Sequence, residues 1–490
     1  MTDTQEQLDL AIIKRKAVSG VVTFTIRTFF IQAFTFIATF ILTVLLEPSI
    51  FGVFFVVSAL LNFFIYFSDI GLAAALIQKK EEPTKSDLAT TFTIQQTIIV
   101  TLVVLGLLFS SKIAHFYNLD PKGLMLLRFL IFSLFLSSLK TIPSIILERR
   151  LDFTRLVIPQ IAENIIFYTI AVTLAFMKFG IASFSWAVLA RGVVGLIIVY
   201  SICPWKPSLA FNLKSAKKLT SFGLPFQLNS ILALLKDDLL TIFLGKILPF
   251  SQIGYIGWSQ KWAFLPLRFF MDNVNKVTFP AYSRLQEHKD HLSKAIEKSI
   301  FFVTFLTFPS IFGLIAIAPS IMLIIPHYQK WQPAVPLLYM FAINGLFSSV
   351  STTFTNTLFA LGKPKMVLKF MIFWTAATWV LTIPLVIKFG FIGVGIASAL
   401  VASTSVVTIY FAKKSVSVNI TKSVLGPLFI SIIMFIYIKG LLILFPSDIT
   451  SLIFSILSGA IIYLAISFLL FKNILKADLM VITKSIFFKN

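Results

Sequence analysis

The sequence has little charge, one cysteine and only four histidines. Charged residues make up 13% of the 490 residues, and with a mean hydropathy of +0.93 this leaves no room for a sizeable soluble domain. Cys203 is the single cysteine, so an intrachain disulfide is excluded and the redox compartment cannot be read from cysteine usage. No P-loop, Rossmann glycine pattern or nucleophile constellation occurs. We therefore predict that the chain is not an enzyme and uses no ATP, metal or other cofactor.

Long apolar runs are what the sequence has in abundance. Hydrophobic residues make up 58% of the chain, and runs of about 20 of them recur, each long enough to cross roughly 30 Å of hydrocarbon as a helix. The runs are continuous, not alternating, which disfavours a spanning β-barrel. We predict an all-α integral membrane protein with about fourteen transmembrane helices, near residues 18–42, 50–77, 88–111, 124–147, 157–177, 184–203, 222–244, 252–273, 299–325, 334–360, 370–387, 391–411, 423–444 and 451–471.

The net charge of +22 admits two interpretations, a nucleic-acid partner or membrane topology. With the N-terminus in the cytoplasm, the inner segments hold 28 of the 42 basic residues and the predicted spans hold 7. The outer segments hold the other 7, which include Lys439 of the span 423–444 because we expect its side chain to snorkel outward. This asymmetry follows the positive-inside rule. It predicts a multi-pass protein of the bacterial inner membrane with both termini in the cytoplasm. It also predicts contacts with anionic lipid headgroups and no nucleic-acid partner.

A weak internal repeat divides the chain into two halves. Three short segments recur in the same order in both halves: 178–181 and 388–391, 48–52 and 249–254, and 148–155 and 362–369. Since both halves start on the same side of the membrane, we predict parallel repeats. The predicted organisation is a cytoplasmic N-terminal segment (1–17), an N-lobe (18–203), a cytoplasmic connector (204–221), a C-lobe (222–411), two further helices (412–471) and a cytoplasmic tail (472–490).

The loop 274–298 predicts an amphipathic helix that lies along the inner membrane surface. Leu285, Leu292 and Ile296 share one face of such a helix, while basic residues such as Arg284 and Lys289 lie elsewhere on it.

Seven cations lie inside the predicted spans when Lys439, which is counted with the outer segments, is left aside. Each costs roughly 2.5–3.5 kcal/mol at the centre of a bilayer, so seven of them indicate a polar interior and an anionic cargo. The cations are Arg27, Arg128, Lys140, Arg191, Lys236, Lys261 and Arg268, and five acids accompany them: Asp69, Glu163, Asp237, Asp238 and Asp272.

Four local motifs occur in order along the chain: Leu46–Gly52 (LEPSIFG), Asp69–Leu72 (DIGL), Phe279–Gln286 (FPAYSRLQ) and Ala360–Pro364 (ALGKP). With the plan of six, six and two helices and the cationic interior, they resemble the multidrug/oligosaccharidyl-lipid/polysaccharide (MOP) exporter superfamily. Within it, the chain is similar to the bacterial polysaccharide flippases of the Wzx type. The resemblance covers roughly residues 15–475. It implies two helical lobes around a central cavity that work by alternating access.

Such a flippase moves a sugar headgroup that is linked to a polyprenyl chain through pyrophosphate. Arginine suits this cargo because its planar fork binds phosphate through two hydrogen bonds and stays charged at any physiological pH. Arg27 lies about ten residues into its predicted helix, and Arg268 follows Pro266, which is expected to kink the helix. On a continuous helix Lys261 shares a face with Arg268. The resemblance implies that the first and seventh helices line the cleft.

The predicted substrate-binding residues are therefore Arg27, Arg268, Lys261, Arg191, Lys236 and Asp237. Structural alternatives remain open for most of the intramembrane charges. Lys236, Asp237, Asp238 and Lys261 lie on adjacent predicted helices, where an acid can meet Lys261 across the hairpin. Arg128 and Lys140 are close enough to helix ends to reach an interface. Glu163 either pairs with Arg191 or lines the cavity, Arg268 can pair with Asp272, and Asp69 is expected to pack near the inner rim.

The aromatic residues of the eighth predicted helix also have two interpretations. Trp258, Trp262 and Tyr255 either stack on sugar rings or, for Trp258 and Tyr255, belong to an interfacial aromatic belt.

Three functions compete. The first is a flippase for polyprenyl-pyrophosphate-linked oligosaccharides in O-antigen, capsule or exopolysaccharide assembly, with lipid II as a neighbouring cargo. The second is a drug/cation antiporter of the same fold, which needs buried acids without surplus cations. The third, a membrane-embedded glycosyltransferase or polymerase, needs longer outer loops than this chain has. The charge balance favours the first, with a coupling ion (proton or sodium) and the polysaccharide polymerase machinery as further candidate partners.

Overall fold

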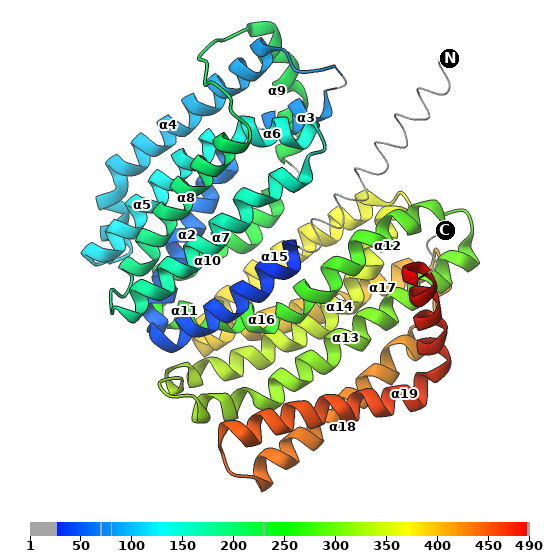
Figure 1. Cartoon of the computed structure of the whole chain (residues 1–490). Coiled ribbons are helices and arrows are strands. Elements are labelled where there is room, and N and C mark those ends of the chain that lie inside the picture. Colours follow the sequence, from blue (N-terminus) through cyan, green and yellow to red (C-terminus); the bar gives the residue numbers. More distant parts are fainter. Residues whose placement is uncertain (1–26, 69–70, 80, 229–230, 488–490) are drawn as a thin grey trace. The chain divides into compact units, whose positions relative to one another are not determined.

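The computed structural model describes residues 27–68, 71–79, 81–228 and 231–487 (Figure 1). Nearly all of these residues are helical, so the predicted all-α fold class is confirmed. Backbone contacts divide the chain after Gly257 into two units, which we call unit 1 (up to Gly257) and unit 2 (from Trp258 onward).

Twelve helices in the described part of the chain are long and apolar enough to cross a membrane, so the protein is a multi-pass membrane protein. They coincide with twelve of the fourteen predicted spans: Arg27–Leu45, Pro48–Tyr66, Lys85–Phe116, Pro121–Arg149, Phe153–Phe176, Ala182–Ile202, Lys289–Ile324, Gln329–Ala360, Pro364–Phe389, Ile392–Lys413, Ser423–Leu444 and Ile449–Lys472. The predicted spans 222–244 and 252–273 correspond to the shorter helices α10 (Ile231–Ile247) and α11 (Phe250–Ala263). The number fourteen stays a prediction.

Unit 1 begins with the helix Arg27–Leu45, which we call the first helix. It continues with α2 (Pro48–Ser68), α3 (Leu72–Gln78), α4 (Lys85–Phe116), α5 (Pro121–Leu139), α6 (Thr141–Arg149), α7 (Phe153–Phe176), α8 (Ala182–Ile202), α9 (Leu213–Leu228), α10 and the beginning of α11. Helix α7 packs along α8, α8 packs against α5, and α5 packs against α4 (Figure 1). Helix α10 packs against α2.

The predicted connector 204–221 is packed against the helices that precede it. Leu219 of α9 is buried with Leu72 and Leu76 of α3, and the backbone N–H of Asn212 donates to the hydroxyl of Thr90 on α4 at 3.0 Å. The connector is therefore part of unit 1, and the boundary of the two contact-defined units falls later, within α11. The lobes 18–203 and 222–411 remain a prediction about the moving parts.

Arg149 holds the end of the short helix α3. Its guanidinium donates hydrogen bonds to the backbone carbonyls of Leu76 (2.6 Å), Ile77 (3.0 Å), Lys79 (2.8 Å) and Glu81 (3.0 Å). A cation that satisfies the last carbonyls of a helix also complements the negative end of the helix dipole. The basic turn at 148–155 is thus partly structural.

Unit 2 contains the rest of α11, a π-helical turn (Leu267–Met271) and a 3-10 helix (Gln329–Ala334). Its remaining helices are α12 (Asp272–Arg284), α13 (Lys289–Ile324), α14 (Val335–Ala360), α15 (Pro364–Phe389), α16 (Ile392–Ser403), α17 (Val406–Lys413), α18 (Ile420–Leu444) and α19 (Ile449–Phe487). Helices α18 and α19 pack against each other and against α13, and the hydroxyl of Tyr463 on α19 donates to the carbonyl of Phe305 on α13 at 2.8 Å.

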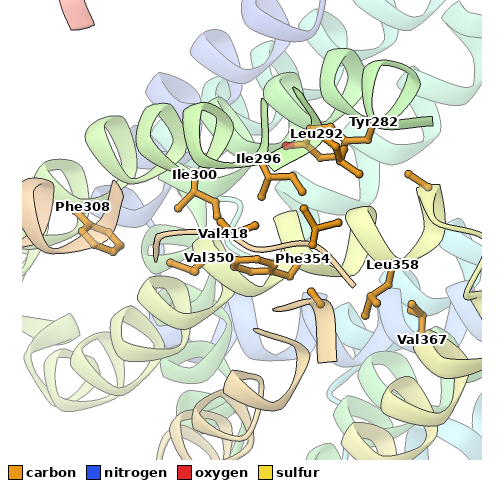
Figure 2. Packing of buried hydrophobic residues seen from close by; sticks show 13 residues of the cluster. Tyr282, Leu292, Ile296, Ile300, Phe308, Val350, Phe354, Leu358, Val367 and Val418 are labelled. Atoms are coloured by element: carbon orange, nitrogen blue, oxygen red, sulfur yellow. The ribbon is translucent and has the colours of Figure 1, made fainter. Parts of the chain in front are cut away.

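The core of unit 2 corrects the prediction of a surface helix over 274–298. Helix α12 ends at Arg284 and the long α13 begins at Lys289, so the segment holds parts of two helices. Leu292 and Ile296 are fully buried with Phe354 of α14 (Figure 2). The apolar stripe that the sequence offers is real, but it faces the protein core and not a lipid surface.

Backbone hydrogen bonds at two of the recurring segments agree with the internal repeat, which stays a prediction. The N–H of Ile50 donates to the carbonyl of Glu47 (3.0 Å), and 202 residues later the N–H of Gln252 donates to that of Pro249 (2.9 Å). A second pair of turns matches in the same way: the N–H of Ser183 donates to the carbonyl of Gly180 (3.1 Å), and the N–H of Gly393 donates to that of Gly390 (3.0 Å). The structure describes both segments of the third predicted correspondence, 148–155 with 362–369, and they have no matching bond of this kind.

Candidate functional site

Glu163 of α7 lies at the centre of a charge cluster inside unit 1. Its Oε1 atom accepts a hydrogen bond from Nζ of Lys140, and its Oε2 atom lies 3.6 Å from Nε of Arg191 on α8. The Glu163 and Lys140 side chains are 12% and 15% exposed, whereas that of Arg191 is 53% exposed. We call these three residues the Glu163 cluster. It holds two cations and one carboxylate, so one positive charge is left over.

Gly195 of α8 makes room for this carboxylate. A Cβ atom at this position would lie 1.9 Å from Oε1 of Glu163, so a side chain there would displace the carboxylate. Gly195 follows Arg191 by four residues and therefore shares its helical face. That spacing is the sequence signal by which the contact could have been found.

The structure decides between the sequence alternatives for two of these residues. The predicted pair between Glu163 and Arg191 is confirmed. Lys140, which the sequence allowed to reach an interface, instead points to Glu163, so that alternative is wrong. Lys140 stands at the junction between α5 and α6, where its neighbour Leu139 accepts a hydrogen bond from the hydroxyl of Tyr200 at 3.0 Å. Its role in the cluster was missed.

Arg191 keeps hydrogen-bonding capacity to spare. Glu163 meets only its Nε atom, and within the described part of the chain its two terminal nitrogens have no protein partner. A guanidinium in this state offers a fork of donors to an incoming anion. Because an unpaired charge toward lipid is costly, this exposed fork is expected to face a water-filled space.

Arg27 begins the described part of the first helix. This helix packs against α7, where the hydroxyl of Thr35 donates to Oδ1 of Asn164 at 3.3 Å and Phe34 contacts Tyr168 edge to face at 6.2 Å. Arg27 itself is half-buried, and its Nε atom is buried without a hydrogen-bond partner among the described residues. A buried guanidinium with an unused donor is costly, and an anionic ligand would remove that cost.

Helix α10 carries the charges predicted for the seventh span. Lys236 is half-buried, and Asp237 is exposed. Asp238 accepts a hydrogen bond from Nδ2 of Asn62 on α2 at 3.0 Å, a partner that the sequence analysis missed. The predicted pair between an acid of this helix and Lys261 remains a prediction.

Lys261 and Arg268 lie on a broken helix in unit 2. Helix α11 ends at Ala263, and the π-helical turn Leu267–Met271 follows Pro266 directly. Arg268 stands in this turn with an exposed side chain, and Lys261 is half-buried. The predicted distortion at Pro266 is therefore confirmed. The prediction that Lys261 and Arg268 share a helical face assumed a continuous helix, and that assumption is wrong. π-helical turns occur frequently at functional sites. Asp69 and the side chain of Asp272 lie outside the described part of the chain.

Two other groups of candidate residues prove to be structural. Trp258 and Trp262 are buried, 5% and 7% exposed, and Trp258 stacks on Trp331 at 5.6 Å between ring centroids. The Nε1 atom of Trp258 donates to the hydroxyl of Tyr328 at 3.2 Å. The predictions of sugar stacking by these two tryptophans and of an interfacial position for Trp258 are therefore wrong, while that for Tyr255 stays a prediction.

Arg128 connects two helices of unit 1. Its Nε atom donates to Ser110 at 3.1 Å, and its Nη2 atom donates to Ser111 at 3.3 Å, so it ties α5 to α4. The guanidinium is thus partly satisfied by the protein, which makes it a weaker anion-binding candidate than Arg191.

Comparison with known proteins adds a family and a fold. The family model described as "Polysaccharide biosynthesis protein" matches residues 41–336. The chain is 24% identical over 346 residues to the succinoglycan biosynthesis transport protein ExoT of Rhizobium meliloti, an alignment that covers 70% of this chain and 67% of ExoT. It is 22% identical over 413 residues to the lipopolysaccharide biosynthesis protein WzxC of Escherichia coli, covering 81% of each.

Among solved structures, the inward closed conformation of the lipid II flippase MurJ is similar in fold. The TM-score is 0.74 at 18% sequence identity, and the match covers 93% of this chain and all of that one (100%).

Proposed function

The chain belongs to the polysaccharide biosynthesis protein family, and from this premise we propose that it is a flippase of the bacterial inner membrane. Its cargo is an oligosaccharide unit linked through pyrophosphate to a polyprenyl lipid, and its role is the assembly of a surface polysaccharide. The relatives named for succinoglycan and lipopolysaccharide biosynthesis support this class of pathway. We assign transport by alternating access and no catalytic step.

The observation that carries the proposal is the surplus of partly satisfied arginine inside apolar helices. Arg191 has two terminal nitrogens without a protein partner, and Arg27 has a buried Nε atom without one, in the part of the chain that is described. Such donors are expensive to keep in a membrane protein unless an anion uses them. A pyrophosphate headgroup has the charge and the oxygen geometry that this fork binds.

The alternative of a drug/cation antiporter fits the Glu163 cluster poorly. An antiporter for cationic drugs needs an acid that is free to attract the drug, whereas the Glu163 carboxylate already meets two protein cations. A lipid II flippase shares the pyrophosphate chemistry, so the charges alone do not separate it from our proposal. The sugar carried separates them.

Topology and coupling complete the proposal. We place both termini in the cytoplasm on the strength of the loop charges. A proton or sodium gradient is the proposed energy source, and the polysaccharide polymerase machinery is the proposed partner on the far side. Reporter fusions after residue 490 should be active only in the cytoplasm, and alkaline phosphatase activity there would contradict the topology.

The test of the cargo uses a host that lacks its own oligosaccharide flippase. The chain should restore surface polysaccharide, while Arg27→Ala or Arg268→Ala should lose export although the protein still accumulates in the membrane. Lysine at these positions should rescue poorly because it offers a point charge without the fork. Normal polysaccharide output from both alanine variants would reject these residues as phosphate ligands.

A matched control is Arg128→Ala. Arg128 is also an intramembrane arginine, but serine hydroxyls of α4 already accept its hydrogen bonds. We expect this variant to reduce the amount of folded protein slightly and to leave export per folded molecule unchanged. The contrast separates loss of a phosphate ligand from loss of any arginine.

A further inference from the structure

We propose that Arg191 binds a phosphate of the cargo and that Glu163 occupies the same guanidinium when the cargo is absent. Phosphate and carboxylate then exchange at one site in unit 1. The inference rests on the proposed function and adds a competing residue to it, since Glu163 would regulate how tightly the cargo is held.

Glu163 makes a close contact with Lys140 and a longer one with Arg191. The longer contact is the one that a phosphate can replace. The carboxylate is bound closely by Lys140, and both side chains are largely buried. The contact with Arg191 is longer, 3.6 Å, and Arg191 is about half exposed. The oxygen that Lys140 binds, Oε1, also lies against Gly195, where a side chain would displace it. Arg191 can therefore turn away while Glu163 stays paired.

The charge of the cluster favours the same exchange. Without cargo it carries one surplus positive charge, spread over Lys140 and Arg191. A phosphate oxygen that reaches Arg191 neutralises this surplus, and Glu163 keeps its contact with Lys140. When the cargo leaves, Glu163 can satisfy Nε of Arg191 again, so the empty site is not left with a bare charge in the membrane.

This arrangement predicts that removing the carboxylate charge strengthens binding and slows release. Glu163→Gln keeps the size of the side chain but takes away the anion that competes for Arg191. We expect the affinity for the cargo headgroup to rise about fivefold, the scale of a partly exposed ion pair, while export falls because bound cargo leaves slowly. Arg191→Lys should lower the affinity by a similar factor.

The measurement uses the full chain in nanodiscs of zwitterionic lipid, with undecaprenyl pyrophosphate as the probe. Asp152→Asn, at the N-cap of α7, is the control, because it removes the ion pair with Arg155 (3.5 Å) at the start of the helix, away from the cluster. Affinity should change only in the Glu163 and Arg191 variants. A second arm replaces the probe with phosphatidylglycerol, and an equal effect there would assign the site to ordinary lipid headgroups and overturn the proposal.

Unchanged affinity in Glu163→Gln would also overturn it. If that variant folds poorly because Lys140 loses its partner, Lys140→Met combined with Glu163→Gln removes both charges and should still bind the probe more tightly than the wild type. A wild-type protein that neither binds nor moves the lipid would instead defeat the proposed function itself, so the two failures are distinguishable.

A second inference comes independently from the repeated turns at 48–52 and 250–254. A Cβ atom on Gly52 would lie 1.8 Å from the carbonyl oxygen of Phe250, and one on Gly254 would lie 2.0 Å from that of Pro48. With an offset of 202 residues between the two repeats, Pro48 is equivalent to Phe250 and Gly52 is equivalent to Gly254. The two contacts are therefore the same contact seen from each repeat, as in an interface with twofold symmetry.

The rest of the contact also depends on glycine. Gly257 on α11 would place a Cβ atom 2.2 Å from the ring of Phe55, and Gly245 on α10 would place one 2.5 Å from Val56. Helix α2 thus lies against a glycine-lined surface, the kind of surface on which membrane helices approach most closely. We infer that this contact closes the predicted outer end of the protein and separates during transport.

Gly52→Ala and Gly254→Ala test this inference, with Gly440→Ala as the control. Gly440 has no atom within 4 Å of the position its Cβ would take. The readout is the rate at which Ser251→Cys reacts with a membrane-impermeant maleimide; the native Cys203 is buried and should react slowly. We expect the first two variants to raise this rate severalfold and to reduce export at normal protein levels, and the control to change neither.

A contact that stays closed throughout transport gives different results. In that case the amount of folded protein and the export fall together in Gly52→Ala and Gly254→Ala, or neither these quantities nor the labelling rate changes. Either result overturns the inference. Should the variants fold too poorly to measure, the Ser251→Cys protein alone decides. If the contact separates during transport, the labelling rate of this protein should change when undecaprenyl pyrophosphate is added. A constant labelling rate contradicts the proposal.

Discussion

The helices of unit 1 and those in the core of unit 2 are joined by different polar groups. Unit 1 holds full charges in its interior, with Lys140, Glu163 and Arg191 in one cluster. The core of unit 2 is joined by neutral groups, such as the indole of Trp258 with the hydroxyl of Tyr328 and the amide of Asn344 with the hydroxyl of Ser398 at 2.7 Å. Neutral pairs hold helices together at low cost, whereas surplus charge is retained where a ligand can use it.

The largest effect expected from this comparison is on the stability of unit 2. Trp331 is fully buried and stacks on Trp258, so Trp331→Ala should cost about 3–5 kcal/mol in unfolding free energy. Trp186→Ala, at a tryptophan that is 45% exposed in unit 1, is the control and should cost much less. Thermal unfolding in detergent measures both. Equal midpoints for the two variants would show that burial in unit 2 does not stabilise the protein.

The next effect concerns the charges of unit 1. Lys140→Met leaves Glu163 largely buried with only the longer contact to Arg191, and should cost about 3 kcal/mol. Adding Glu163→Gln should recover most of this loss, because a neutral pair replaces an orphaned charge. The double-mutant cycle for unfolding measures the coupling. Additive losses would mean that the two residues do not depend on each other.

The smallest effect tests a single neutral bond of unit 2. Tyr463→Phe removes the hydroxyl that donates to the carbonyl of Phe305 at 2.8 Å and changes little else. We expect a loss of about 1 kcal/mol in unfolding free energy, with transport per folded molecule unchanged. Tyr410→Phe, at an exposed tyrosine, should have no effect. A change in cargo affinity from Tyr463→Phe would contradict the interpretation that this neutral bond of unit 2 stabilises the fold without taking part in cargo binding.

The apolar runs of the sequence were enough to predict most of the fold. Twelve predicted spans have counterparts because a continuous stretch of about 20 apolar residues has few alternatives to a membrane helix. The region around 222–273 was harder. Pro266 indicated a distortion, but the π-helical turn that carries Arg268 depends on how the following residues pack, and spacing along an ideal helix does not contain that information.

The candidate site was only partly predictable for a related reason. An intramembrane Glu163 and Arg191 on neighbouring helices suggested a pair by the cost of leaving either alone. Lys140 and Gly195 joined the cluster only through the angle at which α5, α7 and α8 meet, which is a tertiary property. Leu292 and Ile296 show the same limit, since an amphipathic stripe fits a protein core as well as a lipid surface.

We propose that the intramembrane arginines bind the anionic group of a lipid-linked sugar. The most direct measurement reconstitutes the purified chain in liposomes with a fluorescent polyprenyl-pyrophosphate-linked oligosaccharide and follows its protection from an external quencher. Wild-type protein should move the lipid faster than empty liposomes, and Arg27→Ala should abolish this gain. A wild-type rate equal to that of empty liposomes, together with export of a cationic dye, would show that these arginines do not serve an anionic cargo.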